Sequence, residues 1–231
     1  MCLRIPPALW QSHRAAELLR SYWAVRWDGT PACTGSRFER LGGGGDRLSV
    51  ANRFTADDVI AVTTLGVSIP ATAALQLLEP DPAHAFSELL AQLPVTTRLV
   101  DVDASLIGRE GPARQLWERL NGLRWIGPVI AGKLMARKRP ALFPVYDSVI
   151  KWVFDRPEND VLFWSDMRCE LQADDGRLIT HLERARTTAG LGDDISVLRV
   201  LDTMAWRYGK EVMPSRRQLA HPCPPQWLIE S

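Results

Sequence analysis

The sequence predicts an all-α fold, or one that is nearly all-α, and three observations lead to this prediction. Apolar residues recur at the three-to-four-residue spacing of helices in most segments of the chain. Residue types that begin and end helices flank these segments. The chain has no internal repeat and no run of alternating apolar and polar residues. We therefore expect one helical domain over residues 9–209, followed by a Pro-rich, disordered tail over residues 210–231.

The N-terminal half of the chain is expected to form a series of short helices. Thr55 followed by Asp57 and Asp58 is typical of a helix start, because the Thr side chain caps the first turn and acids favour the positive end of the helix dipole. Arg98–Val102 is the one strand-like stretch in the chain. Helices are expected over residues 9–25, 55–67, 71–78 and 86–93.

The C-terminal half shows the same organisation around a tight turn at Gly127-Pro128. Pro140 and Pro144 end the helix that follows this turn, because proline cannot continue a helix. Asp147 then lies at the start of the next helix, where the dipole favours its ionised form. Helices are expected over residues 112–122, 129–139, 145–155, 159–172, 177–189 and 195–208.

Charge is balanced over the whole chain and unbalanced in one segment. The 231 residues carry a net charge of +1, with an apolar content of 46% and a charged content of 24%, as in an ordinary globular protein. Residues 109–156, however, hold ten basic and four acidic residues, an excess of six positive charges. A basic patch in an otherwise neutral chain is typical of a nucleic-acid-binding surface.

The cysteines and the apolar segments exclude several classes of protein. Four cysteines lie far apart without a C-x-x-C pair, which excludes a standard zinc finger and a four-Cys iron–sulfur cluster. The four histidines are scattered and suggest neither a metal site nor a catalytic triad. The chain has no signal-peptide core and no apolar run of about 18 residues. We expect reduced thiols and a soluble cytoplasmic protein, with no cofactor and no membrane contact.

Residues 120–154 resemble the helix-hairpin-helix and catalytic-Asp segment of the DNA glycosylase superfamily. That hairpin is written approximately L-P-G-V-G-x-x-x-A, and Leu123, Gly127 and Ala131 fall on the pattern. Asp147 lies twenty residues after Gly127, at the offset where the family has its catalytic Asp. Trp125 stands where the first Gly of the pattern is expected, so we expect the turn to differ there.

This resemblance implies a DNA glycosylase-like helical domain with its helix-hairpin-helix at residues 114–139. It implies duplex DNA as the partner and hydrolysis of an N-glycosidic bond, since a carboxylate such as Asp147 stabilises the oxocarbenium-like sugar and orients water. Val129 occupies the position of the lysine in glycosylases that are also lyases, so a monofunctional enzyme is implied.

Two groups of residues complete this hypothesis. A flipped base needs aromatic or apolar walls, and DNA phosphates need cations and backbone N–H groups. The candidate wall or wedge residues are Trp125, Tyr146 and Trp152. The candidate DNA-binding residues are Arg124, Gly127, Lys133, Arg137, Lys138 and Arg139.

Simpler interpretations of the same residues stay open. Asp147 is equally a helix cap, in which case the protein is a non-enzymatic DNA-binding module. Trp125 and Trp152 are of a type that usually lies in the core. The run 137–139 fits a solvated helix end favoured by the dipole.

A second candidate site surrounds four consecutive glycines, Gly42, Gly43, Gly44 and Gly45, between Arg37 and Arg47. One interpretation is a flexible connector, since glycine is costly to order. The other is a loop whose backbone approaches a phosphate, which would make the protein a binder of a nucleotide or another phosphorylated small molecule. It is not a P-loop, because no G-K-[ST] follows.

A wider resemblance covers roughly residues 10–210. The phrases TGSRFERLGGGGDR, RFTADDVIAV and ARKRPALFPVYDSVI are similar to those of an uncharacterised family of small bacterial proteins. This second resemblance implies no activity.

Overall fold

The computed structural model describes residues 3–157 and 162–213. Over these residues the chain is helical, and β-structure is limited to one isolated bridge between Val25 and Pro31. This confirms the all-α prediction. No helix of the described ranges is both long and apolar enough to cross a membrane.

Eleven α-helices are formed within the described residues. They are α1 (Ser12–Trp23), α2 (Ala56–Thr63), α3 (Ala71–Leu78), α4 (Pro80–Ala91), α5 (Ala104–Ile107), α6 (Pro112–Asn121), α7 (Pro128–Lys138), α8 (Ser148–Val153), α9 (Phe163–Gln172), α10 (Arg177–Thr188) and α11 (Val197–Val212). Short 3-10 helices lie at η1 (Pro7–Trp10), η2 (Thr34–Arg37), η3 (Leu41–Gly43) and η4 (Ala173–Gly176).

Local sequence patterns correctly predicted the positions of several of these helices. Thr55 caps α2 in a reciprocal capping box with Asp58, as its sequence indicates. The strand expected at Arg98–Val102 is wrong: this segment is a turn, closed by a hydrogen bond from Asp101 N to Arg98 O of 3.1 Å. An isolated extended segment has no partner strand here to satisfy its backbone groups.

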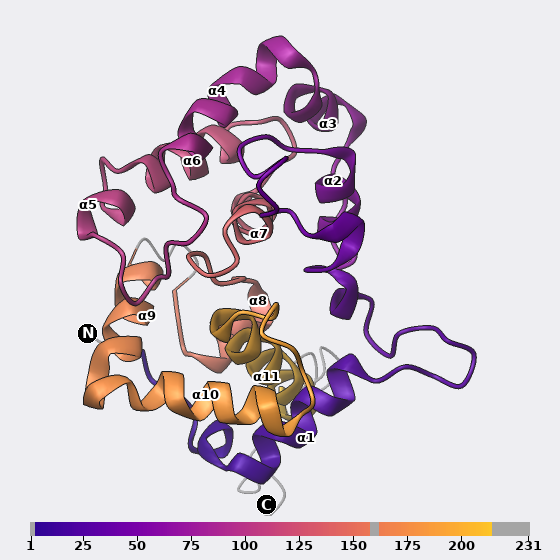
Figure 1. Ribbon diagram of the computed structural model, residues 1–231, viewed down its shortest axis with the longest axis vertical. Coiled ribbons are helices and arrows are strands. Elements are labelled where there is room, and N and C mark those ends of the chain that lie inside the picture. Colours follow the sequence, from indigo (N-terminus) through magenta and orange to yellow (C-terminus); the bar gives the residue numbers. More distant parts are fainter. Residues whose placement is uncertain (1–2, 158–161, 214–231) are drawn as a thin grey trace, which may run out of the picture.

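The helices form two groups that meet around α7 and α8 (Figure 1). In one group α2 and α6 pack against α7, and α4 packs on α6 and α3. In the other group α1 packs on α10 and α11, so segments from the two ends of the chain lie side by side. Helix α8, which follows α7 in the chain, packs on α11.

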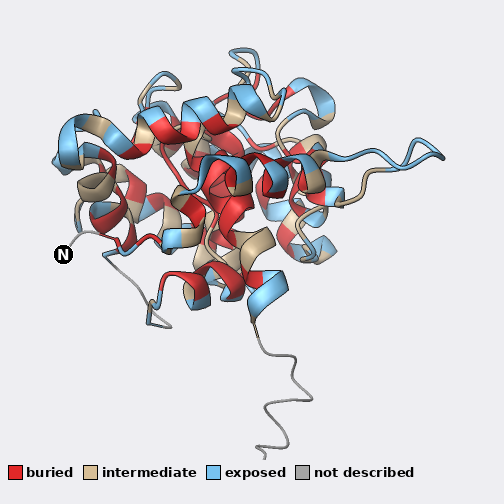
Figure 2. Ribbon diagram, turned by 90° about the horizontal axis from the view of Figure 1, so that it is seen from below, coloured by how far each residue is buried: buried red, intermediate tan, exposed pale blue. Residues whose placement is uncertain are grey.

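Helix α7 lies at the centre of the molecule (Figure 1), and buried residues concentrate in the interior of the helical assembly (Figure 2). Seven of its eleven residues are buried, including Leu134 and Met135 in the hydrophobic core. A helix with so little exposed surface cannot present its C-terminal cations to solvent.

Two further expectations need correction or restriction. Helix α11 continues to Val212, so the tail does not begin at residue 210, and residues 214–231 lie outside the described part of the chain. Cys169 is disulfide-bonded, whereas Cys33 is a free thiol. The expectation that all the cysteines are reduced is therefore wrong for Cys169.

Candidate functional site

A pocket of about 340 Å³ lies where the two groups of helices meet. Its walls come from α1, α7, α8 and α11 together with the loops that follow α1 and α2. The polar and aromatic side chains that line it include Tyr22, Lys133, Asp147, Arg199, Asp202 and Trp206. Two of these, Asp147 and Lys133, were singled out from the sequence.

Asp147 has two relationships with its surroundings. It is the N-cap of α8, and its Oδ1 accepts hydrogen bonds of 3.0 Å from the backbone N–H groups of Val149 and Ile150. It also lines the pocket. Because both of its hydrogen bonds within the described residues use Oδ1, Oδ2 stays available for a ligand. The capping role is real, and it does not remove the carboxylate from the pocket.

Lys133 brings an amine into the same pocket. Its side chain is buried, and Nζ donates a hydrogen bond of 2.9 Å to the carbonyl of Leu65. Burial lowers the pKa of Lys133, and the negative charge of Asp147 opposes that shift in part. An ammonium group has three donors, so two remain for a ligand or a carboxylate.

A buried ion pair forms another part of the wall. Arg199 NH1 donates to both carboxylate oxygens of Asp202, at 3.1 and 2.9 Å. Arg199 NH2 donates to the hydroxyl of Tyr22 and to the carbonyl of Gly35, each at 2.8 Å. Burial raises the pKa of Asp202 to about 7, against the opposing effect of Arg199. A Cβ at Gly35 would lie 2.1 Å from the Tyr22 hydroxyl oxygen, so a side chain there would disrupt this wall.

The aromatic side chains of the pocket are Tyr22 and Trp206, whose ring centroids lie 5.8 Å apart in an edge arrangement. Sequence reasoning missed both. For Trp206 the signal was its spacing from Arg199 and Asp202, which places three chemistry-bearing side chains along one face of α11. Tyr22 had no comparable signal, since it is brought to them by long-range packing.

The three aromatic residues expected at the site are not among the pocket's lining residues. Tyr146 donates from its hydroxyl to the Pro157 carbonyl at 3.0 Å and contacts Phe163. Trp125 and Trp152 are both exposed, which contradicts the alternative that they belong to the core.

The basic cluster of α7 and its C-cap is directed into the protein, not toward solvent. Exposed fractions are 3% for Lys133, 2% for Arg137, 0% for Lys138 and 1% for Arg139. These side chains cannot reach a DNA phosphate in this conformation. Their burial contradicts the prediction that these four residues form a DNA-binding surface. It also contradicts the alternative that residues 137–139 form a solvated helix end.

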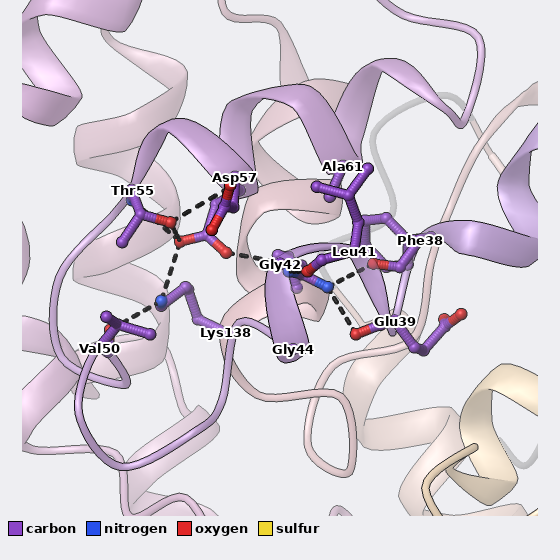
Figure 3. A network of polar contacts seen from close by, with 12 residues as sticks. Phe38, Glu39, Leu41, Gly42, Gly44, Val50, Thr55, Asp57, Ala61 and Lys138 are labelled. Atoms are coloured by element: carbon purple, nitrogen blue, oxygen red, sulfur yellow. Dashed lines mark hydrogen bonds and ion pairs between the residues drawn. The ribbon is translucent and has the colours of Figure 1, made fainter.

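The partners of Arg137 and Lys138 come from η3, from the loops before and after it, and from α2 (Figure 3). Asp58 accepts from Arg137 Nε at 2.9 Å and from Lys138 Nζ at 3.0 Å. Lys138 Nζ also donates to the Val50 carbonyl at 2.8 Å. Arg137 further donates to main-chain carbonyls at 38, 39 and 41. The network therefore attaches the Gly-rich loop to the central helix.

Arg139 is satisfied almost entirely by carbonyl oxygens. Nε donates to Leu93 O at 2.5 Å, and NH2 donates to Leu90 O at 2.6 Å and to Asn52 Oδ1 at 2.7 Å. NH1 donates to Ala51 O and to the carbonyl of Lys138. Five hydrogen bonds match the five N–H donors of a guanidinium. Burial lowers the pKa of Arg139 to about 10, and the side chain ties the end of α4 to α7.

The Gly-rich loop is a defined turn, which contradicts a flexible connector. Gly42, Gly43 and Gly44 have φ of 59°, 81° and 93°, the region that favours glycine. The N–H groups of Gly43 and Gly44 donate to main-chain carbonyls at 40 and 41. Arg47 donates to the carbonyls of Gly42 and Gly44. A Cβ at Gly45 would lie 2.4 Å from Arg137 O, so this glycine permits close packing. The exposed side chain of Arg37 lies before this turn.

The turn between α6 and α7 has its unusual backbone at Trp125. Trp125 has φ of 72°, a conformation that is rare for a bulky residue, and its side chain is 67% exposed. The guanidinium of exposed Arg124 lies 5.3 Å from the Trp125 ring centroid. Gly127 has φ of −87°, and nothing lies within 4 Å of a Cβ built there. The residue at the first-Gly position of the hairpin pattern thus adopts a glycine-like backbone.

Comparisons with known proteins identify the family and give no activity. Neither the curated proteins nor the solved structures contain a match to this chain. A family model described as "Family of unknown function (DUF6308)" matches residues 15–209, which includes every pocket residue named above. The chain therefore belongs to this family of unknown function, DUF6308.

Proposed function

We propose that this protein binds DNA and hydrolyses the N-glycosidic bond of a nucleotide whose base enters the pocket beside Asp147. The observation that carries the proposal is the presence of Asp147 and Lys133 in one pocket between the two helix groups. Asp147 supplies the negative charge that stabilises a cationic sugar, and Oδ2 orients the attacking water.

Lys133 has a complementary role in this proposal. The departing base gains negative charge as the bond breaks, and a nearby ammonium group stabilises or protonates it. Burial lowers the pKa of Lys133, which makes its proton easier to transfer. The wild-type lysine at 133 is therefore expected to contribute to the departure of the base, while Asp147 acts on the sugar.

The size and the aromatic wall of the pocket support a nucleobase as ligand. A volume of about 340 Å³ falls at the lower end of the range of small-molecule sites. Tyr22 and Trp206 offer ring surfaces for a planar base. Access to a base in duplex DNA requires that the nucleotide leave the helical stack.

The turn between α6 and α7 is the proposed contact with the DNA backbone, as a helix-hairpin-helix in a glycosylase-like domain. Arg124 is an exposed cation there, and the open space at Gly127 permits close approach of a phosphate to the first turn of α7. In this proposal the turn binds the phosphates, in place of the buried cations Lys133, Arg137, Lys138 and Arg139.

The decisive experiment changes one carboxylate and compares it with a matched control. Asp147→Asn preserves the capping ability and the size but removes the charge. Asp103 also caps a helix, by accepting from Ser105 N at 2.8 Å, and it is not a lining residue of the pocket. The assay is the formation of alkali-labile abasic sites in DNA that carries damaged or modified bases.

We expect Asp147→Asn to lower base release by about a hundredfold or more, and Asp103→Asn to leave it unchanged. DNA affinity should stay equal or rise in Asp147→Asn, because a charge that repels phosphate is lost. If the wild-type protein releases no base from any substrate, a non-enzymatic DNA-binding module becomes the better description. Equal losses in both variants would indicate that capping alone matters.

A further inference from the structure

A short hairpin projects from the body of the protein immediately after α1 (Figures 1 and 2). We call residues 24–32 the finger. At its tip Trp27 is 99% exposed, and Val25 is 58% exposed. Tryptophan is usually well buried, so a fully exposed indole on a projecting segment indicates a binding surface.

The finger has a defined conformation within the described chain. Its base is closed by hydrogen bonds of 2.8 Å from Ala32 N to Ala24 O and from Arg26 N to Thr30 O. Its tip is closed by the Asp28 carboxylate, which accepts from Thr30 N and Oγ1 at 2.9 and 2.6 Å. The backbone that carries Trp27 is therefore a closed turn, so this segment of main chain need not become ordered when a ligand binds.

The finger is also part of the pocket. Arg26, Pro31 and Ala32 line the same cavity as Asp147 and Lys133. A free nucleoside inside the cavity ends there, whereas a nucleotide within a strand continues past its rim. The finger forms part of the lining of the pocket, so a strand that continues out of the pocket on this side can contact the finger.

We propose that the finger binds the DNA strand on one side of the nucleotide held in the pocket, with the Trp27 ring stacked on a neighbouring base. An aromatic ring stacks on every base, so this contact selects a strand over a free nucleoside without reading its sequence. Arg26 places a cation near the adjacent phosphate. This inference rests on the proposed function, since it deepens the description of its substrate.

The test is the affinity for labelled oligonucleotides, measured by fluorescence anisotropy on single-stranded DNA and on a duplex with an abasic-site analogue. Trp27→Ala should weaken both complexes about fivefold or more, and Trp27→Phe should retain most of the affinity. Leu48→Ala is the matched control, because Leu48 is another exposed apolar side chain, 89% exposed, on a different loop. Circular dichroism should show the same helix content in all four proteins.

Unchanged affinity in Trp27→Ala, or no binding by the wild type, would overturn the inference. So would loss of self-association in Trp27→Ala, by sedimentation velocity, with oligonucleotide affinity intact; the finger would then bind a second copy of the chain. These measurements do not depend on base release. Trp27-dependent binding without base release would contradict the proposed chemistry alone, and base release with Trp27-independent binding would contradict the finger alone.

Discussion

The Asp58 carboxylate lies 2.9 Å from Nε of Arg137, and both side chains are 1% exposed. Asp58 belongs to α2 and Arg137 to α7, so this ion pair joins two helices in the interior. Lys138 shares the same carboxylate at 3.0 Å. Two buried cations thus depend on one acid, and a buried charge without a partner is costly.

Asp58→Ala is therefore expected to destabilise the protein by about 3–5 kcal/mol. Chemical denaturation measures this change as a lower midpoint with an unchanged slope. Asp57 is the matched control, because it is the neighbouring acid, is 46% exposed and pairs with Arg47 only at 3.6 Å. Asp57→Ala should cost no more than about 1 kcal/mol. Similar losses in both variants would show that the buried pair has no special role.

Arg139 is buried and Arg124 is exposed, so a change at Arg139 should affect stability and a change at Arg124 should affect DNA binding. Arg139→Lys keeps the charge but offers three donors in place of five, which leaves buried carbonyls unpaired and costs about 1–3 kcal/mol.

Arg124→Ala removes an exposed cation and should leave stability within about 0.5 kcal/mol. The same change should weaken DNA binding across sequences and lower the salt slope by about one. Wild-type DNA affinity in Arg124→Ala would contradict the assignment of the turn.

Replacing Trp125 by glycine should change the stability of the protein and its DNA affinity in opposite directions. Its φ of 72° costs roughly 1 kcal/mol for a residue other than glycine. Trp125→Gly removes this strain and loses only an exposed contact with Arg124, so the protein should be as stable as the wild type or slightly more stable. Its DNA affinity should fall if the exposed ring contacts DNA.

Gly127→Ala should leave stability nearly unchanged, because Gly127 has an extended backbone and open space around a Cβ.

The helices were largely predictable from the sequence because their signals are local. The bounds of α3 match the expected 71–78, and Thr55 caps α2 as expected. The burial of Arg137, Lys138 and Arg139 was not predictable from the sequence, because basic residues at a helix end usually remain solvated. Their burial depends on carbonyls of a loop nearly a hundred residues earlier, with 99 residues separating Phe38 and Arg137.

The candidate site was predictable only in part, for the same physical reason. Asp147 was identified by its offset from the turn, a relationship within one segment. Tyr22 and Arg199 are 177 residues apart and meet only because α1 packs on α11. Such contacts are set by tertiary packing, which no local pattern encodes. The left-handed backbone at Trp125 is hidden from the sequence for another reason, since glycine is the residue expected at such a position.

The last prediction concerns pH and the buried carboxylate Asp202. Burial raises its pKa to about 7 from an ordinary value of 3.8, with Arg199 opposing the shift and Glu39 and Asp147 adding to it. The folded state therefore binds more protons than the unfolded state between these two pH values. Stability from this group is fully present below pH 3.8 and is lost as the pH rises through about 7. Burial also raises the pKa of Glu39, which acts in the same direction.

Thermal or denaturant unfolding at several pH values should reveal this slope, and Asp202→Asn should flatten it. The variant keeps the size of the side chain and removes the proton uptake that distinguishes the folded state. Glu183→Gln serves as the control, because Glu183 lies on the outer part of α10 and changes the same kind of group outside the pocket. If wild-type and Asp202→Asn proteins lose stability equally between pH 5 and about 7, Asp202 is ionised throughout this range and its ion pair with Arg199 outweighs its burial.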